Sequence, residues 1–450
     1  MGDMKNCGKC GKSASLVCGG CGDVVYCTTS CQKSAWKNGH KRECKAYKIE
    51  IHPEYGRYLV ATRELKPGSR ILCKLQPAVV GPPLINPNYG CLNCHNPVKK
   101  SVICPTCKNV FCSQKCLQIF CSQTEMCEFL AKLDKPNLRI ISPLKFLCLE
   151  KSDKNTFDSL MKLESHSEEL QKSDRWTDLK KNVIDPLVDI TNENPEKITE
   201  LVGILSTNSF ELLNQLKAEQ GKAPFSGLFE LASLMNHHCI GNTRLVVDND
   251  SNGIFKLSVY ASVAISKGSP ILFNYVKPLD RTINRQENLM DFKFFKCSCS
   301  RCEDPTEMNT FNSAYLCPKC QVGPVIFTQK NWMCNDCQAD FDPVKVKHIE
   351  DQIAKAQEKL AKIQRLYDLA QAKTLFKDFQ SILYPSHGFM LEILQALITC
   401  TASAINNPGP EKELLMQRER IKWCSQIMES LDVLEPGLSI GRGEFASSTT

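Results

Sequence analysis

Apolar positions along the chain follow two periods, which separate a strand-rich part from helical parts. Residues 56–80 predict two short apolar strands on either side of a Lys-Pro-Gly turn at 66–68. Residues 256–263 alternate between apolar and other side chains, which predicts a half-buried strand. A turn at Lys267-Gly268 and a short apolar segment follow it. The apolar positions of the alternating strand lie on one face: Leu257, Val259, Ala261 and Val263.

Helical periodicity governs residues 131–225, which are polar, and the chain from residue 344 onward. The C-terminal part predicts a helical bundle or helical repeats, broken near Pro385 and Pro408. Residues 388–405 form the longest apolar run but contain Glu392 and Gln395, so we expect an amphipathic or core helix and no membrane span. One apolar series recurs at spacings of three and four: Ile349, Ile353, Ala356, Leu360 and Ile363.

Composition indicates a globular protein of several folding units, with 450 residues, 42% hydrophobic and 23% charged. The first residues contain no apolar signal region, so we expect a soluble protein of the cytoplasm, the nucleus or both. The chain holds 27 cysteines against 8 histidines. Because the cytosol keeps thiols reduced, their paired spacings favour zinc over disulfides.

The first cysteine cluster supplies a complete set of zinc ligands. Residues 7–44 have the order C-x2-C-x7-C-x2-C-x5-C-x3-C-x8-H-x3-C, enough for two closed tetrahedral sites. Bound metal must supply the folding free energy, because so short a segment buries no core. The pattern resembles a MYND finger. That family's interleaved pairing implies one zinc on Cys7, Cys10, Cys27 and Cys31, and another on Cys18, Cys21, His40 and Cys44.

The second cluster repeats this order as far as its sixth ligand. No histidine follows that ligand, and Cys121 is the available substitute. The alternatives are a second MYND-like finger with eight ligands, or one good zinc site beside a degenerate one. We predict the eight-ligand form: Cys91, Cys94, Cys104, Cys107, Cys112, Cys116, Cys121 and Cys127.

Two further cysteine groups lie nearer the C-terminus. One has the pattern of a zinc ribbon, with two pairs of cysteines and two residues between the members of each pair. The other offers three ligands, so a closed site needs a fourth from elsewhere in the chain. The ribbon ligands are Cys317, Cys320, Cys334 and Cys337, and the group of three is Cys297, Cys299 and Cys302. The isolated cysteines are expected to be small buried hydrophobes: Cys73, Cys148, Cys400 and Cys424.

The net charge changes when zinc is counted. Lys and Arg number 56 and Asp and Glu 49, a formal charge of +7 that favours nucleic acid at first sight. Zinc ligands are thiolates, however. With 23 cysteine ligands and about six zinc ions, the loaded protein carries a charge of about −4. We therefore expect no sequence-specific nucleic-acid binding.

One segment carries a second resemblance. Residues 235–242 read Met-Asn-His-His-Cys-Ile-Gly-Asn, similar to the N-H-S-C-x-P-N motif of SET domains, with His238 for serine and Gly241 for proline. Together with Asn274-Tyr275 and the C-x-C-x2-C group, it resembles a SET domain with a post-SET zinc site, in which Cys239 is the implied fourth ligand. A MYND finger inserted after the first SET strands is typical of the SMYD lysine methyltransferases. The extra N-terminal finger and the ribbon are most like the arthropod branch.

This resemblance implies a protein-lysine N-methyltransferase that uses S-adenosylmethionine. It assigns Asn236 and His237 to cofactor contacts and places Tyr275 at the catalytic position, where a hydroxyl would orient the lysine amine. The family's Gly-x-Gly cofactor loop falls on Gly56, Arg57 and Tyr58. The walls of a lysine channel are expected from Phe294 or Phe295, for which core packing is the alternative.

Two departures from the family pattern leave a second hypothesis open. Tyr58 replaces the second glycine of the cofactor loop, where a side chain limits how closely backbone approaches the cofactor. The family's G-E-E-L box reads Gly-Ser-Pro-Ile-Leu at 268–272 and lacks its acidic residues. The alternative is an impaired scaffold whose MYND fingers recruit proline-rich partner peptides.

The expected fold class is α+β: a β-rich SET domain with an inserted MYND finger, a post-SET zinc site, an extra N-terminal MYND finger, a zinc ribbon and a C-terminal helical region. The expected partner is a protein lysine, with histones among the candidates and a role in transcription, and the expected state is a monomer. The expected ranges are 1–46 for the first finger, 47–90 for the start of SET, 91–130 for the second finger, 131–225 for a helical insertion, 226–280 for the SET core, 281–305 for the post-SET site, 306–340 for the ribbon and 341–450 for the helical domain.

Overall fold

The computed structural model describes residues 6–19, 24–41, 44–85, 90–95, 98, 100–123, 125–212, 225–249, 254–328, 330–404, 410–439 and 442–443. The chain forms two compact units with interleaved segments. Unit 1 comprises Met1–Asn236, Thr243–Ile271 and Asp291–Phe294, and unit 2 comprises His237–Asn242, Leu272–Met290 and Phe295–Thr450. The eight predicted ranges stay predictions.

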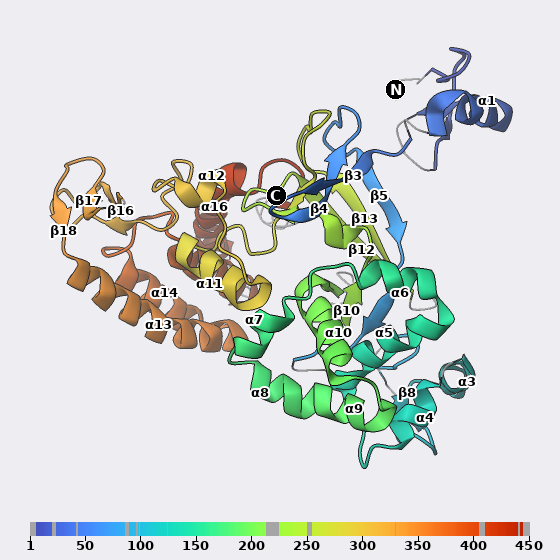
Figure 1. The fold of residues 1–450 in the computed structure, drawn as a ribbon. Coiled ribbons are helices and arrows are strands. Elements are labelled where there is room, and N and C mark those ends of the chain that lie inside the picture. The colour runs from blue at the N-terminus through green and yellow to red at the C-terminus, as the bar shows by residue number, and fades with distance from the viewer. Residues whose placement is uncertain are drawn as a thin grey trace. The chain divides into compact units, whose positions relative to one another are not determined.

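Unit 1 contains small antiparallel sheets (Figure 1). Strands β3 and β4 form a hairpin in which Tyr47 pairs with Ala61 and His52 with Gly56. Strand β13 lies between β12 and β5, and β10 lies between β6 and β9. The strands of unit 1 are β1 (Leu16–Val17), β2 (Val25–Tyr26), β3 (Tyr47–His52), β4 (Gly56–Ala61), β5 (Arg70–Leu75), β6 (Val79–Gly81), β7 (Val102–Ile103), β8 (Val110–Phe111), β9 (Phe210–Leu212), β10 (Phe225–Leu228), β12 (Thr243–Asn249) and β13 (Phe255–Ala261).

Helices of unit 1 gather mostly between residues 114 and 208, as the polar helical pattern predicts. They bury apolar faces against one another and against β6, which α5 contacts. They are α1 (Thr29–Ala35), η1 (Trp36–His40), α3 (Gln114–Gln123), α4 (Met126–Ala131), η2 (Leu138–Ile140), α5 (Ile141–Ser152), α6 (Lys154–Leu160), α7 (Ser167–Lys172), α8 (Trp176–Leu179), η3 (Lys180–Ile184), α9 (Asp185–Thr191), α10 (Pro195–Asn208) and η5 (Ala232–Leu234).

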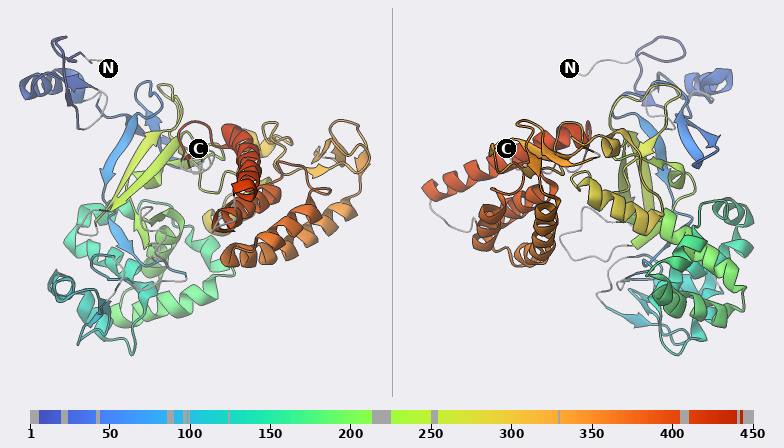
Figure 2. Two further views of the ribbon diagram at one scale, coloured as in Figure 1. Left: turned by 180° about the vertical axis from the view of Figure 1, so that it is seen from behind. Right: turned by 60° about the vertical axis from the view of Figure 1, so that its left-hand side comes forward.

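Unit 2 combines a four-stranded ribbon sheet, in the order β15-β16-β17-β18, with a helical part. Helices α13, α14, α15 and α16 pack against one another around a large apolar core (Figure 2). Strand β11 (Asn236–His237) and helix α11 (Thr282–Lys293) contribute residues to both units. The other elements are β14 (Leu272–Phe273), α12 (Ser300–Glu303), β15 (Tyr315–Leu316), β16 (Pro324–Phe327), β17 (Trp332–Cys334), β18 (Asp340–Phe341), α13 (Pro343–Leu366), α14 (Leu369–Phe379), α15 (Gly388–Ala404) and α16 (Pro410–Leu434).

The periodic segments form the elements that their patterns predict, with one difference at the end of β13. All five residues of the apolar series beginning at Ile349 are buried on α13. Strand β13 ends at Ala261, so Val263 lies beyond it and not on its apolar face. Strands β4 and β5 flank the Lys-Pro-Gly turn as predicted, with β4 paired to β3 and β5 to β13.

The apolar run at 388–404 forms α15, a core helix of unit 2. Cys400 and Cys424 are fully buried, as expected, whereas Cys73 and Cys148 are only half-buried because they lie nearer the surface. Across the part of the chain that the structure describes, none of the helices is long and apolar enough to cross a membrane.

Candidate functional site

The N-terminal finger gathers its cysteines as the interleaved pairing requires. The potential ligand atoms of Cys7, Cys10, Cys27 and Cys31 lie within 4.8 Å of one another, and so do those of Cys18, His40 and Cys44. The predicted fourth ligand of the second group, Cys21, lies outside the described residues.

Local structure of this finger positions its ligands. Thr28 caps α1 by accepting a hydrogen bond from the backbone N–H of Cys31 at 3.1 Å. The buried His40 places its Nε2 3.3 Å from Cys18 Sγ, and its ring packs edge-on against Tyr26 and Trp36. Zinc accepts such nitrogen and sulfur ligands in tetrahedral geometry.

The second cluster also gathers two ligand sets. One consists of Cys91, Cys94, Cys112 and Cys116, whose sulfurs lie within 4.8 Å. In the other, Cys121 Sγ lies 3.7 Å from Cys104 Sγ and 3.4 Å from Cys127 Sγ, and Cys107 interacts with Cys104. Cys121 therefore lies with the ligand set that lacked a seventh ligand, for which the first cluster uses a histidine. This position supports the eight-ligand prediction over a degenerate second site.

Two similar turns of the ribbon hold its predicted zinc ligands. The backbone N–H of Gly323 donates to Cys320 Sγ at 3.3 Å, and that of Cys337 to Cys334 Sγ at 3.5 Å. A Cβ at Gly323 would lie 2.6 Å from Cys334 Sγ, so a larger residue would displace a predicted ligand. The four predicted ribbon sulfurs lie within 4.8 Å of one another.

The remaining group brings together sulfurs that are distant in sequence. Cys239 joins Cys297, Cys299 and Cys302 within 4.8 Å, so it occupies the place predicted for the fourth ligand. Its sulfur lies 3.4 Å from Cys302 Sγ, and its side chain is fully buried. The four groups of four cysteines, the Cys18 group and the Cys104 group all suit zinc. Zinc binding by each named residue stays a prediction.

The segment around Cys239 crosses the segment around Tyr275 within unit 2. The N–H of His238 donates to the carbonyl of Phe273, and that of Asn242 to the carbonyl of Leu272, both at 3.2 Å. A Cβ at Gly241 would lie 2.9 Å from the backbone nitrogen of Asn274, so the close crossing explains a residue without a side chain here.

His237 connects the candidate catalytic tyrosine to the cysteine site. The backbone N–H of Tyr275 donates to His237 Nδ1 at 3.0 Å, so the ring proton is on Nε2. Nε2 lies 3.3 Å from Cys239 Sγ and donates to it. The imidazole thus has a contact that the sequence prediction, which assigned His237 to the cofactor, did not include.

His238 acquires a role that the sequence left unexplained. Its Nδ1 accepts a hydrogen bond from the backbone N–H of Ile240 at 3.0 Å. Serine and threonine side chains close the same kind of local turn through a hydroxyl. The imidazole therefore acts as a turn-forming acceptor at the position where the motif has serine.

Tyr275 lies among aromatic rings of unit 2. Its centroid is 5.1 Å from that of His237, and Phe295 lies 5.9 Å from His237. Burial raises the pKa of the Tyr275 phenol, so the hydroxyl keeps its proton at neutral pH. Phe294 belongs to unit 1, where its ring packs against Arg175 and His166. Of the two predicted channel aromatics, Phe295 is therefore the one near His237 and Tyr275.

The cofactor-loop residues lie on the β3–β4 hairpin of unit 1. Gly56 has φ +68°, which favours glycine, and Arg57 donates to the carbonyl of Lys162 at 2.8 Å. Tyr58 donates its hydroxyl to Glu50 at 3.1 Å, and its ring packs edge-on against Tyr55. Asn236 is half-buried at the end of unit 1.

Comparison with known proteins agrees with these clusters. The sequence model of the MYND finger matches residues 7–44, and that of the SET domain matches residues 56–276. The chain belongs to the SET and MYND family. The second cysteine cluster lies inside the SET match, as an insertion does.

Relatives of this SET and MYND chain include proteins of insects and plants. It is 32% identical over 162 residues to SET domain-containing protein SmydA-8, isoform A, of Drosophila melanogaster, which covers 35% of this chain and 34% of the relative. It is 23% identical over 373 residues to histone-lysine N-methyltransferase ASHR1 of Arabidopsis thaliana, covering 76% and 75%. The match thus spans about a third of the first relative's length.

A solved structure of the SET domain of LSMT bound to lysine and AdoHcy is 12% identical and covers 92% of this chain and 90% of its own, with a TM-score of 0.34.

Sequence reasoning missed the groups that surround the Cys239 cluster. Arg285 donates to Cys239 and Cys302, and Arg301 lies between two predicted ligands. The position of Arg301 inside the C-x-C-x2-C group was a visible signal. No feature of the sequence indicated Arg285, because only the fold brings α11 close to the sulfurs.

Proposed function

We propose that this chain is an S-adenosylmethionine-dependent protein-lysine N-methyltransferase. The observation that carries the proposal is the crossing in unit 2, where Tyr275 is hydrogen-bonded through His237 to the Cys239 cluster. The backbone hydrogen bond fixes the main chain of Tyr275, and its ring packs against that of His237. Both contacts support a defined position for the hydroxyl, which positioning a reacting amine requires. The names of ASHR1 and of a Pongo abelii relative, protein-lysine N-methyltransferase SMYD4, support the same reaction class.

When bound, S-adenosylmethionine supplies a methyl group on a sulfonium. The Tyr275 hydroxyl, protonated because its pKa is raised, orients the neutral amine of the incoming lysine. The ring of His237 packs against that of Tyr275 on one side and against that of Phe295 on another. Gly56, Arg57, Tyr58, Asn236 and His237 stay the predicted cofactor residues.

The position of the Tyr58 side chain distinguishes the enzyme hypothesis from the scaffold hypothesis. Its hydroxyl bonds Glu50, and Tyr55, against which its ring packs, stacks on His52 with centroids 3.7 Å apart. The side chain is thus held by residues of its own hairpin. This geometry supports the hypothesis that Tyr58 leaves the cofactor-loop backbone accessible.

Calorimetric titration with S-adenosylmethionine tests this hypothesis. We expect the wild type to bind, and Tyr58→Gly to change the affinity by less than about tenfold, or roughly 1.4 kcal/mol. A silent wild type whose Tyr58→Gly variant binds would instead favour the scaffold, in which the MYND fingers recruit proline-rich peptides.

Substitution of Tyr275 separates binding from chemistry. Tyr275→Phe keeps the ring and removes the hydroxyl, so cofactor binding is expected to persist. Methyl transfer to lysine substrates, with histones as the first class to assay, is expected to fall by a factor on the order of 10²–10³. Unchanged turnover would remove Tyr275 from the catalytic role.

The finer assignments follow from the same proposal. We propose zinc in about six sites, a histone or other protein lysine as substrate, and a role in transcription for a monomer in the cytoplasm, the nucleus or both. The likeness to SmydA-8 supports a place in the arthropod branch.

A further inference from the structure

Two arginines of unit 2 have no exposed surface. Arg285, on α11, and Arg301, on α12, are both 0% exposed. Their shared partner is Glu307, whose Oε2 lies 2.7 Å from Arg285 Nη1 and 2.8 Å from Arg301 Nη2. Glu307 is itself 2% exposed and also accepts hydrogen bonds from Ser313 and Thr282. Buried charges are tolerated when they are paired and hydrogen-bonded in this way.

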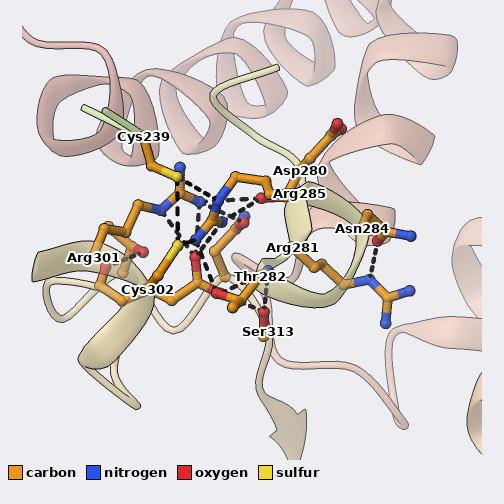
Figure 3. A network of polar contacts seen from close by, with 12 residues as sticks. Cys239, Asp280, Arg281, Thr282, Asn284, Arg285, Arg301, Cys302 and Ser313 are labelled. Carbon is orange, nitrogen blue, oxygen red and sulfur yellow. Dashed lines mark hydrogen bonds and ion pairs between the residues drawn. The ribbon is translucent and has the colours of Figure 1, made fainter. Parts of the chain in front are cut away.

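At contact distance, the single charge of Glu307 faces two guanidinium groups, while the Asp280 carboxylate interacts with both arginines without a direct ion pair. The contact ion pairs therefore leave part of the positive charge uncompensated. Two other donors of Arg285 reach sulfur (Figure 3): its Nε lies 3.3 Å from Cys239 Sγ, and its Nη2, which also donates to Thr282 Oγ1 at 2.9 Å, lies 3.5 Å from Cys302 Sγ. Four thiolates around one Zn²⁺ carry a charge of −2. The excess positive charge of the arginines and the negative charge of a loaded zinc site therefore compensate each other.

The same guanidinium groups hold the backbone that follows Tyr275. Arg301 Nη1 donates to the carbonyl of Pro278 at 2.6 Å, and Arg285 Nη1 to that of Asp280 at 2.7 Å. Arg301 Nη2 also donates to Asp280. The charge network thus contacts the zinc ligands on one side and the segment after the candidate catalytic residue on the other.

We propose that Arg285 is a positioning residue of the Cys239 zinc site. It orients two of the four thiolates and offsets their charge, while Glu307 and the carbonyl of Asp280 fix its guanidinium. The proposal rests on zinc being bound at this cluster. It predicts that Arg285 controls the retention of one zinc ion out of the whole complement.

Zinc release from the full chain tests the proposal. The metal content of wild type, Arg285→Met, Arg285→Lys and Arg281→Met is counted first, and release to excess chelator is then followed with a zinc-sensitive dye. Arg281 is the matched control, since it is 6% exposed and ion-paired to Glu350 at 2.6 Å, while its guanidinium bonds Asn284 instead of sulfur.

In Arg285→Met we expect one zinc to leave about 10- to 100-fold faster, the size of effect typical of lost outer-shell contacts. Arg281→Met should release zinc as the wild type does. Arg285→Lys retains the charge without the planar fork and should recover part of the wild-type rate. If Arg285→Met does not fold, Arg285→Lys decides, because faster release of one zinc supports the proposal and an unchanged rate overturns it.

Two other outcomes also overturn the proposal. They are equal effects in Arg285→Met and Arg281→Met, and faster release of every zinc alike. If the Cys239→Ser variant kept the metal count of the wild type, zinc would not be bound at this cluster. That result would contradict the metal assignment, which distinguishes the two failures.

Discussion

The ribbon and the Cys239 cluster are both four-cysteine groups of unit 2, but they are held in different ways. The ribbon sulfurs come from one stretch of 21 residues, 317–337, and accept backbone N–H groups of their own turns. Cys317 and Cys334 also belong to the large apolar core shared with α13–α16. Among the described residues, the buried apolar cluster around Cys239 contains only Leu289 and Cys297 besides it.

Buried polar side chains hold the Cys239 cluster together, whereas backbone turns and an apolar core hold the ribbon. Cys239 lies 58 positions before Cys297, so no local turn can bring their sulfurs together. His237 and Arg285 donate to the Cys239 sulfur instead. A zinc site assembled from distant segments therefore depends on buried polar residues that a ribbon does not need.

The largest expected effect comes from replacing one ligand in each site. Cys239→Ser should lose one zinc and unfold the segment from 272 to 303, because little apolar core remains to hold it. Structural zinc contributes about 10–16 kcal/mol, as much as a whole domain's stability. Cys320→Ser should also lose one zinc but keep α13–α16 folded. Metal analysis combined with hydrogen exchange of both regions measures the difference.

The contrast would be wrong if both variants lost protection over the same residues. It would also be wrong if Cys239→Ser kept the full zinc content of the wild type. Either result would mean that the metal at the Cys239 cluster contributes no more to unit 2 than the metal in the ribbon.

The same contrast explains what the sequence could and could not predict. Ligand sets were predictable because a closed zinc site needs four donors, which showed that the C-x-C-x2-C group lacked one. The resemblance to a SET domain, and not the spacing, then implied Cys239 as the fourth. The buried face of α13 followed from a period of 3.6. Strand β3 was missed although Tyr47, Ile49 and Ile51 alternate with polar residues, and Ile51 is in fact 79% exposed.

Roles that depend on three-dimensional neighbours were not predictable. Nothing near Arg285 in sequence indicates that it faces sulfur, and Glu307 pairs with it only because a loop folds back. The His237 contact with Cys239 has the same origin. Charged partners outside the ligand set have no fixed spacing, whereas ligands do.

A second prediction concerns the acid that bridges the two arginines. Burial alone would raise the pKa of Glu307, but the charges of Arg301 and Arg285 lower it, so the carboxylate is ionised at neutral pH. Glu307→Gln leaves two buried guanidinium groups without their counter-charge. We expect it to lower the free energy of unfolding by about 3–5 kcal/mol, measured by urea denaturation.

Glu350→Gln is the matched variant on the ribbon side. Glu350 also accepts from an arginine, Arg281 at 2.6 Å, and from Tyr315 of β15, but its side chain is 27% exposed. We expect a cost of about 1 kcal/mol, because solvent screens the charge that remains. Equal costs for the two substitutions would contradict the distinct role given to the buried network.

The smallest expected effect is a pH dependence on the ribbon side of unit 2. His387 is fully buried at the start of α15, with its ring centroid 5.8 Å from that of Tyr315. Burial, and then the charge of Arg281, place the pKa of His387 well below 6.5. Its Nδ1 accepts from the N–H of Phe389 at 3.2 Å, and among the described residues its Nε2 has no hydrogen-bond partner.

The folded protein therefore keeps His387 neutral, while the unfolded chain takes up a proton below about pH 6.5. This contribution to stability is present above that pH and is lost as the pH falls, by at most about 1.4 kcal/mol per pH unit. His387→Asn keeps an acceptor at the helix start and removes the titration. From pH 7.5 to pH 5.5, we expect the wild type to lose stability relative to His387→Asn, because only its unfolded chain gains a proton at this position. Loss of zinc at low pH affects both proteins alike and cancels in the difference. A difference that is constant over this range would contradict a neutral buried His387.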